Sequence, residues 1–170
     1  MRVAIIGNSG SGKSTLADEL ARRCGLAVLD LDTVAWEPDR IAVARDAAAA
    51  CADVRAFCDA RRDWVVEGCY ASLVAESLAF GPTLVFLDPG VEACLAHCRQ
   101  RPWEPHKYPS KAAQDEKLAF LLDWVRDYAR RDDDVSLKAH KSLFERASVR
   151  KLHWQRPHDA TLLDLILEGA

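Results

Sequence analysis

The sequence predicts an α/β protein in which helices cover both faces of a parallel β-sheet. Short apolar runs alternate with longer helical stretches along the chain, a pattern typical of strands joined by crossover helices. A glycine-rich turn, GNSGSGKS, stands between the first apolar run and the first helical stretch. Nothing repeats and no Gly/Ser-rich linker interrupts the chain, so we expect one domain over residues 1–170.

Each expected element rests on a local pattern. Apolar runs such as VAII and TLVFL have the length of buried strands, and the runs predict strands at 3–6, 27–31, 64–67, 83–87 and 151–155. The alanine-rich stretch ARDAAAACADVRAFCDARRD has high helix propensity. We expect helices at 13–24, 45–61, 71–79, 90–100, 114–131, 136–148 and 160–168.

Composition favours a cytoplasmic globular protein. Of the 170 residues, 49% are apolar, which is enough for a packed core. The longest apolar run is far shorter than the ~18 residues of a membrane helix, so no membrane partner is expected. The start, MRVAIIG, lacks the apolar stretch and cleavage site of a signal peptide. The six cysteines form no C-x-x-C pair, so we expect reduced, mostly buried thiols.

The turn at residues 7–14 matches the phosphate-binding pattern G-x-x-x-x-G-K-[ST] in full. Its backbone N–H groups can wrap a phosphate chain, and the following helix N-terminus adds partial positive charge. Lys13 would reach the β- and γ-phosphates, while the Ser14 hydroxyl would ligate Mg²⁺. We therefore expect ATP and Mg²⁺ as cofactors, with nucleotide contacts from Ser9, Gly10, Ser11, Gly12, Lys13, Ser14 and Thr15.

Two aspartates are expected beside this phosphate-binding turn. In the stretch VLDLDTVAW, Asp30 and Asp32 would point to the same side of the second strand. Ligands of such sheets gather at the carboxyl ends of the strands, so Mg²⁺ and Lys13 would balance these charges. Asp30 would hold a Mg²⁺-bound water, and Asp32 would orient or deprotonate an acceptor hydroxyl. Alternatively, both aspartates simply cap the turn that follows.

Residues at the end of the third strand would complete this site. Glu67 is placed to hold a metal-bound water, or is a solvated acid at a strand end. Trp36, Glu67 and Tyr70 would line a pocket for the acceptor substrate, although Trp36 could equally belong to the core.

Charge is distributed unevenly along the chain. The net charge is -3, but residues 99–151 contain 13 Lys and Arg against 9 Asp and Glu. Such a segment suits capture of a small anion, although a solvated helical face has the same pattern. Prolines cluster at 101–111, so we expect a basic lid over approximately 99–131 that closes on the nucleotide. Arg101 and Arg131 of this lid are expected to act on the transferred phosphoryl group.

The end of the fourth expected strand argues against a motor ATPase. Motor-type ATPases typically place a water-activating Glu directly after the acid that ends such a strand. Here Pro89 follows Asp88. Asp before Pro favours a cap on the next helix over a catalytic role.

Taken together, the segments GNSGSGKST, LDLDTVAWEP, WVVEGCY and YARRDDD resemble the small P-loop kinases. The resemblance is closest to bacterial adenylate-kinase-related or "DNA topology modulation" proteins, and more distant to shikimate kinase. It implies a five-stranded parallel sheet of order 2-3-1-4-5 with a helical lid. It also implies that Asp30 and Asp32 serve Mg²⁺ water and the substrate hydroxyl, and that residues 154–161 embrace adenine. Arg101-Pro102 is similar to a lid Arg-Pro of shikimate kinases.

Two departures from these families leave the acceptor open. Adenylate kinases have an arginine after the third strand that grips a nucleoside monophosphate, whereas this chain continues Gly68, Cys69 and Tyr70. The glycine-rich substrate motif of shikimate kinase is also missing.

We therefore expect ATP- and Mg²⁺-dependent phosphoryl transfer to a small hydroxyl-bearing metabolite or nucleoside. One alternative is a nucleotide-dependent regulatory or nucleic-acid-binding P-loop protein, and a second is a nucleoside monophosphate kinase. The acidic net charge and the lack of a recognisable nucleic-acid motif argue against nucleic acid as a partner.

Overall fold

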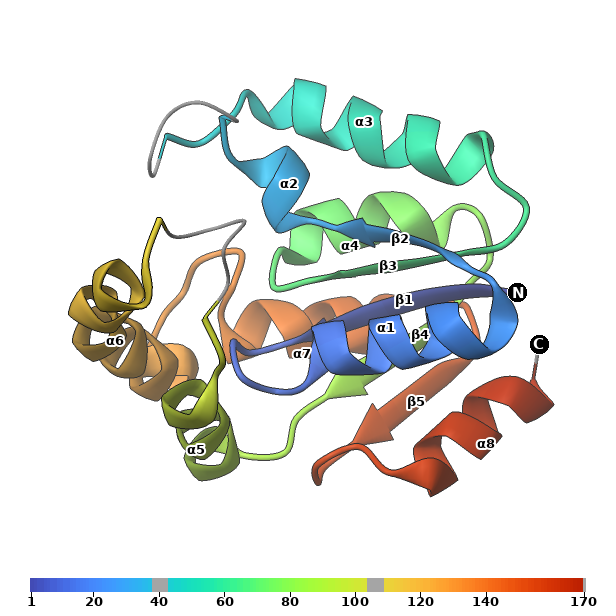
Figure 1. Cartoon of the computed structure of the whole chain (residues 1–170). Helices are drawn as coiled ribbons and strands as arrows, with labels where there is room; N and C mark the ends of the chain where they lie inside the picture. Colours follow the sequence, from blue (N-terminus) through green and yellow to red (C-terminus); the bar gives the residue numbers. More distant parts are fainter. Residues whose placement is uncertain (38–42, 104–108, 170) are drawn as a thin grey trace.

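A computed structural model describes residues 1–37, 43–103 and 109–169 of the chain. Five parallel strands form one sheet in the order β2-β3-β1-β4-β5 (Figure 1). The strands are β1 (Arg2–Gly7), β2 (Ala27–Asp30), β3 (Trp64–Gly68), β4 (Thr83–Leu87) and β5 (Lys151–Trp154). The fold class and the strand order expected from the sequence are confirmed.

Helices α1 (Lys13–Cys24) and α8 (Ala160–Glu168) cover one face of the sheet (Figure 1). Their apolar residues pack on alternate strand residues such as Val3 and Ile5, which are fully buried. This alternation follows from the period of two in a strand, where successive side chains point to opposite faces.

The other face is covered by α3 (Ala47–Asp59), α4 (Ala71–Leu78) and α7 (Leu137–Arg146). Buried residues of this layer include Trp64 and Phe86 of the sheet. Because both faces are covered, the central strands are apolar over most of their length, as is typical of parallel sheets.

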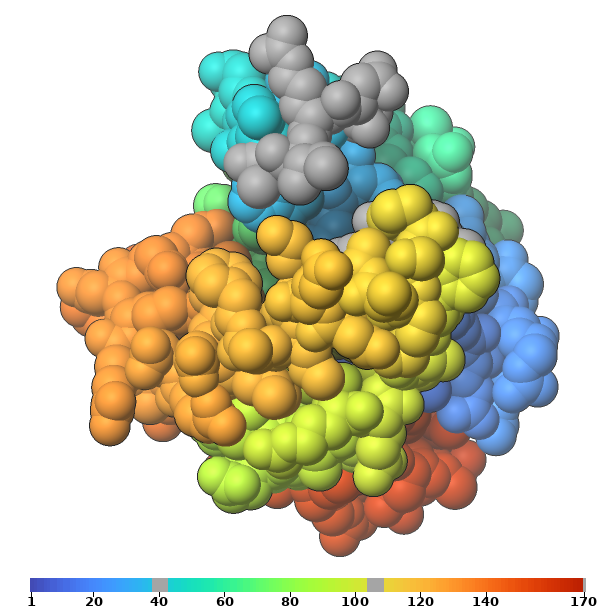
Figure 2. Space-filling view, turned by 60° about the vertical axis from the view of Figure 1, so that its left-hand side comes forward, coloured from blue at the N-terminus to red at the C-terminus, as the bar shows by residue number. Residues whose placement is uncertain are grey.

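Helices α5 (Val91–Gln100) and α6 (Lys111–Arg126) pack on each other beyond the carboxyl ends of the strands. The short 3₁₀ helix η1 (Asp127–Ala129) continues α6. Figure 2 shows the α5–α6 pair on the surface, with a hollow between it and the region of α2 and α3. Among the described residues, no helix is both long and apolar enough to cross a membrane.

The predicted helix at 114–131 differs from the structure at both ends. It begins earlier, at Lys111, because the Ser110 hydroxyl accepts a hydrogen bond of 3.1 Å from the N–H of Ala113 and caps the helix. It ends at Arg126, where the chain tightens into η1. Helix α2 (Asp32–Ala35) was not predicted, because a single turn is too short to show a helical period in the sequence.

Candidate active site

The phosphate-binding turn lies between β1 and α1, as its sequence context predicted. Gly10 and Gly12 have positive φ angles of 78° and 95°, which residues with a side chain rarely adopt. A Cβ on Gly7 would lie 2.4 Å from the carbonyl oxygen of Leu87. The motif glycines are therefore required by backbone conformation and by the close approach of β4.

Lys13 opens α1 and folds back over this turn. Its ammonium donates a hydrogen bond of 3.0 Å to the carbonyl oxygen of Asn8, and the residue is only 7% exposed. Burial alone would lower the pKa of this ammonium, but interactions with Cys69 and Glu67 outweigh it and raise the pKa. Lys13 is thus held charged at the turn that would receive phosphate.

Ser14 and Glu67 meet directly beside Lys13. The Ser14 hydroxyl donates a hydrogen bond of 2.7 Å to Glu67 Oε1. Glu67 is 3% exposed, and burial together with the charge of Asp30 raises the pKa of its carboxyl group, although Lys13 opposes this shift. Glu67 and Asp30 are also register partners on β3 and β2. Both predicted metal ligands at this point, Ser14 and Glu67, are therefore adjacent.

These oxygen donors fit the chemistry of Mg²⁺. The described residues contain no cluster of three or more acidic, histidine or cysteine side chains able to cage a metal. Mg²⁺ in nucleotide sites is usually held by one or two carboxylates together with water and substrate phosphates. The Ser14 hydroxyl and the Glu67 carboxylate are a donor set of this kind.

The second strand ends earlier than the sequence suggested. β2 stops at Asp30, and Asp32 is the first residue of α2, so the expected strand alternation between the two aspartates is wrong. Asp30 Oδ1 accepts a hydrogen bond of 2.9 Å from the N–H of Asp32, which is the capping contact considered as the alternative. Both aspartates nevertheless act electrostatically on Glu67, which places all three acids at one site.

Asp32, Tyr70 and Trp36 form a hydrogen-bonded chain on the acceptor side of this site. The Trp36 indole N–H donates a hydrogen bond of 2.7 Å to the Tyr70 hydroxyl, which donates one of 2.8 Å to Asp32 Oδ1. Burial and the neighbouring Asp32 raise the pKa of the Tyr70 phenol, so it remains protonated. Trp36 is 38% exposed, which excludes a core role.

A second hydrogen-bonded chain, which was not predicted from the sequence, supports the loop after β3. His140 Nε2 contacts the carbonyl oxygen of Cys69 at 2.6 Å, and Tyr128 contacts His140 Nδ1 at 2.6 Å. Because a carbonyl only accepts, Nε2 carries the proton and Nδ1 accepts from Tyr128. Burial lowers the pKa of His140 to about 4, so the ring is neutral. A single histidine on a helix gave no sequence signal for this role.

The α5–α6 pair is anchored to the phosphate-binding turn. The Asn8 side-chain amide donates a hydrogen bond of 3.2 Å to the carbonyl oxygen of Val125, and His97 Nδ1 contacts the carbonyl oxygen of Gly10 at 2.8 Å. Val125 is fully buried, so the end of α6 is fixed while its beginning lies further out.

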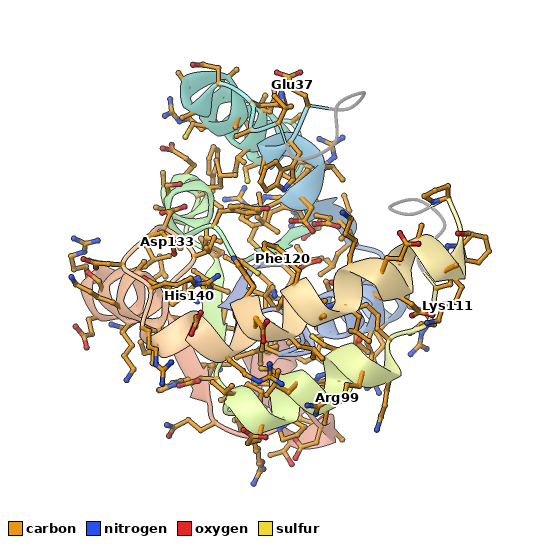
Figure 3. All side chains as sticks on the ribbon, turned by 90° about the vertical axis from the view of Figure 1, so that its left-hand side faces the viewer. Glu37, Arg99, Lys111, Phe120, Asp133 and His140 are labelled. Atoms are coloured by element: carbon orange, nitrogen blue, oxygen red, sulfur yellow. The ribbon has the colours of Figure 1, made fainter. Side chains whose placement is uncertain are left out.

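The two predicted lid arginines lie apart. Arg101 lines a hollow between α5 and α6, together with Arg99, Lys111, Gln114 and Lys117. Arg131 follows η1 and is largely buried, with its side chain 13% exposed and its guanidinium 3.6 Å from the centroid of the Trp124 ring. Figure 3 shows Lys111 at one end of α6 and Asp133, near Arg131 in the chain, at the other end.

Residues 154–161 lie next to the phosphate-binding turn. His158 Nδ1 is 2.8 Å from the point where a Cβ on Gly12 would stand. The loop is braced internally, since the Trp154 indole donates to the carbonyl oxygen of Pro157 at 3.2 Å. The loop is thus positioned beside the turn that would hold a nucleotide.

The expected helix cap at Asp88 is wrong. Gly90 is the N-cap of α5 and makes no side-chain cap. The Asp88 carboxylate instead lies 3.4 Å from His153 Nε2. The backbone N–H of Asp88 donates a hydrogen bond of 2.8 Å to the carbonyl oxygen of Trp154. Asp88 therefore links β4 to β5 instead of capping the helix.

Several solved structures share this fold. A sugar kinase from Janibacter sp. HTCC2649 aligns with a TM-score of 0.56 and 16% identity, over 99% of this chain and 91% of that chain. A gluconokinase from Sinorhizobium meliloti 1021 aligns with a TM-score of 0.54 and 20% identity, over 99% and 88%. Shikimate kinase from Aquifex aeolicus gives a TM-score of 0.54 and 17% identity, over 99% and 97%. At these identities the likeness concerns the fold.

Sequence comparison assigns the chain to a family. No curated protein matches the sequence. Residues 2–155, which include β1 to β5 and the phosphate-binding turn, match the family AAA_28, described as an AAA domain. The chain belongs to this P-loop family, AAA_28.

Proposed function

We propose that this protein transfers a phosphoryl group from Mg·ATP to the hydroxyl of a small molecule. One observation carries the proposal: Asp32 is held by Tyr70 beside Lys13 and the Ser14–Glu67 pair, at the carboxyl ends of the strands. A P-loop alone fits many nucleotide-binding proteins. An oriented carboxylate next to it is what transfer to a hydroxyl additionally requires. The fold shared with sugar, gluconate and shikimate kinases agrees with this proposal.

The phosphate end of the site would be held by the chain's own donors. Backbone N–H groups from Ser9 to Thr15 would surround the phosphates, and Lys13 would exchange its contact with Asn8 for phosphate oxygens. Ser14 and Glu67, with Asp30 nearby, would hold Mg²⁺. The ion, when bound, neutralises charge on the phosphate oxygens.

The acceptor end would be organised by Asp32. Its carboxylate would accept the hydrogen bond of the attacking hydroxyl and take the proton as the new phosphate ester forms. Tyr70 fixes the orientation of this carboxylate, and Trp36 fixes Tyr70, so the acid is held ready before the substrate arrives. Trp36, Tyr70 and Glu67 would also bound the acceptor pocket.

A lid over approximately 99–131 would exclude water from the transfer. Arg101 lies in the basic hollow of the α5–α6 pair and would stabilise charge on the transferred group. Because Asn8 anchors the end of α6, we propose that lid motion concerns mainly the part before Val125. Arg131 lies at the other end of α6, nearer the acceptor side.

Hydrolysis without an acceptor is expected to be slow. Pro89 follows Asp88, where a motor ATPase would carry its water-activating Glu, and Asp88 faces His153. ADP release from Mg·ATP should therefore depend on an added metabolite pool of polyols, sugars, hydroxy acids or nucleosides. Without one, turnover should stay well below the ~1–100 s⁻¹ typical of kinases with substrate.

The same assay separates the alternatives. Rapid turnover without any pool would indicate a motor-type ATPase, and efficient phosphorylation of AMP would indicate a nucleoside monophosphate kinase. Nucleotide binding with no transfer to any pool would favour a regulatory P-loop protein.

A further inference from the structure

The guanidinium of Arg131 is largely buried, and only one of its three nitrogens donates a hydrogen bond to a described residue. Its side chain is 13% exposed and lies over the Trp124 ring at 3.6 Å from the ring centroid. One nitrogen, Nη2, donates a hydrogen bond of 2.9 Å to the carbonyl oxygen of Val135. Nε and Nη1 are buried, and neither has a hydrogen-bond partner among the described residues. Buried polar groups without partners are rare, and a guanidinium of this kind calls for an explanation.

None of the three neighbouring aspartates accepts a hydrogen bond from the Arg131 guanidinium among the contacts of the described residues. Asp133 Oδ1 is 3.9 Å from Arg131 Nε and accepts from the N–H of Val135 instead. Asp132 pairs with Lys138 at 2.6 Å. Asp134 accepts hydrogen bonds from the N–H and hydroxyl of Ser72. Burial lowers the pKa of Arg131, but an arginine stays protonated in proteins, so the positive charge persists.

Arg131 lies on the acceptor side of the site. The loop that follows it packs against the start of α4, where the N–H of Ala71 donates to the carbonyl oxygen of Asp134 at 3.1 Å. Cys69 interacts electrostatically with both Arg131 and Lys13, so both cations lie within range of the loop after β3. Figure 3 shows Asp133 and His140 together at this end of α6, away from Lys111 and the Arg101 hollow.

Given the kinase function proposed above, on which this inference rests, we propose that Arg131 binds an anionic group carried by the acceptor. A carboxylate or phosphate is the natural partner of a desolvated guanidinium, because it supplies both charge and hydrogen-bond acceptors. The acceptor would thus be an alcohol that also bears an oxyanion. Its hydroxyl would reach Asp32, and Arg131 would offset the repulsion from the acids of the pocket.

This assignment differs from a contact with the transferred phosphoryl group. A cation on that group acts in the transition state and raises kcat, whereas a cation on the acceptor's anion acts on binding and lowers the acceptor KM. The two roles are therefore separable by steady-state kinetics.

The test compares acceptors that differ in charge. Wild type is assayed for ADP release with hydroxy acids, with phosphorylated alcohols, and with neutral polyols and nucleosides of similar size. Arg131→Gln removes the charge and Arg131→Lys keeps it. Arg130→Gln is the matched control, because Arg130 is 86% exposed and its nearest acid, Asp127, is 3.7 Å away. Thermal stabilisation by Mg·ATP shows for each variant that the fold and the nucleotide site are intact.

We expect wild type to prefer an anionic acceptor. Comparison of the hydroxy acids with the phosphorylated alcohols should show whether the acceptor carries a carboxylate or a phosphate. Arg131→Gln should raise the acceptor KM roughly 10²-fold, the usual loss for one partner of a buried charge pair, without changing the KM for ATP. Arg131→Lys should retain part of this affinity, and Arg130→Gln should match wild type.

Three results would overturn the assignment. One is preference for a neutral acceptor, which leaves the kinase function standing. Another is a lower kcat in Arg131→Gln with the acceptor KM unchanged. The third is no turnover with any anionic acceptor while Mg·ATP still stabilises wild type. Failure of Mg·ATP to stabilise wild type would instead remove the proposed function itself.

Discussion

The Tyr70 hydroxyl donates a hydrogen bond of 2.8 Å to Asp32 Oδ1 and receives one of 2.7 Å from the Trp36 indole. Since the hydroxyl has a single proton, that proton is committed to the carboxylate. Tyr70 therefore positions Asp32 in this structure, and the two segments that bound the acceptor side, α2 and the start of α4, are joined through it.

Tyr70→Phe should keep the ring packing and lose this hydrogen bond. Hydrogen bonds to charged groups contribute about 1.5–3 kcal/mol, so kcat should fall roughly 10–10²-fold because the base is less well held. Steady-state kinetics with the acceptor found in the metabolite screen measure this change. The thermal stabilisation by Mg·ATP, which should be unchanged in Tyr70→Phe, shows that the fold and the nucleotide site are intact. An unchanged kcat would mean that Tyr70 does not act through Asp32.

Lys13→Ala should abolish most of the thermal stabilisation that Mg·ATP gives to wild type. A ligand at about 100 times its Kd stabilises the folded state by about 2.7 kcal/mol, and the variant lacks the charge that meets the phosphates. Lys138→Ala serves as control, because Lys138 is exposed and pairs with Asp132. Differential scanning fluorimetry measures this stabilisation. Equal stabilisation of Lys13→Ala and wild type would exclude the assigned phosphate site.

Acidification should weaken the fold through His140. Burial lowers its pKa to about 4, while the unfolded residue titrates near 6.5, so the unfolded chain binds the proton first as pH falls. The stability given by neutral His140 is complete above pH 6.5 and is lost towards pH 4, up to about 3 kcal/mol. Urea unfolding at about pH 7 and pH 5 should show a smaller loss for His140→Gln than for wild type. Equal losses of unfolding free energy in wild type and His140→Gln between these two pH values would contradict this account.

The outer part of the lid should become ordered when nucleotide binds. Amides at 99–103 and 111–124 should gain hydrogen-exchange protection with Mg·ATP, because the basic hollow closes on phosphate. Residues 125–131 should change less, since Val125 is already tied to Asn8. Hydrogen-exchange protection confined to the phosphate-binding turn would show that α6 does not move when nucleotide binds.

Much of the sheet could be predicted from sequence because its signals are local. Buried parallel strands are short apolar runs, and the motif at 7–14 specifies a turn that glycines alone can form. The ends of elements were harder to predict. At Asp30 the strand gives way to a helical turn because the side chain captures the N–H of Asp32, a contact that competes with strand pairing.

The parts that sequence could not predict depend on long-range contacts. His140 reaches the carbonyl oxygen of Cys69, 71 residues away, and Asn8 reaches Val125, 117 residues away. Asp88 was expected to cap α5 from its position before Pro89, but β5 brings His153 beside it. Arg101 and Arg131 share a basic segment in sequence, yet α6 separates them because a helix of 16 residues spans about 24 Å.

The most direct test of the central claim follows the γ-phosphate of labelled ATP in wild type and Asp32→Asn. Asparagine keeps the shape of Asp32 and can still meet Tyr70, but it cannot take a proton. With the acceptor identified by screening, label should enter an O-phosphorylated metabolite in wild type. In the variant, transfer should slow roughly 10²–10⁴-fold while Mg·ATP stabilisation stays intact. Label released only as inorganic phosphate, or equal transfer by both proteins, would contradict phosphoryl transfer to a hydroxyl through Asp32.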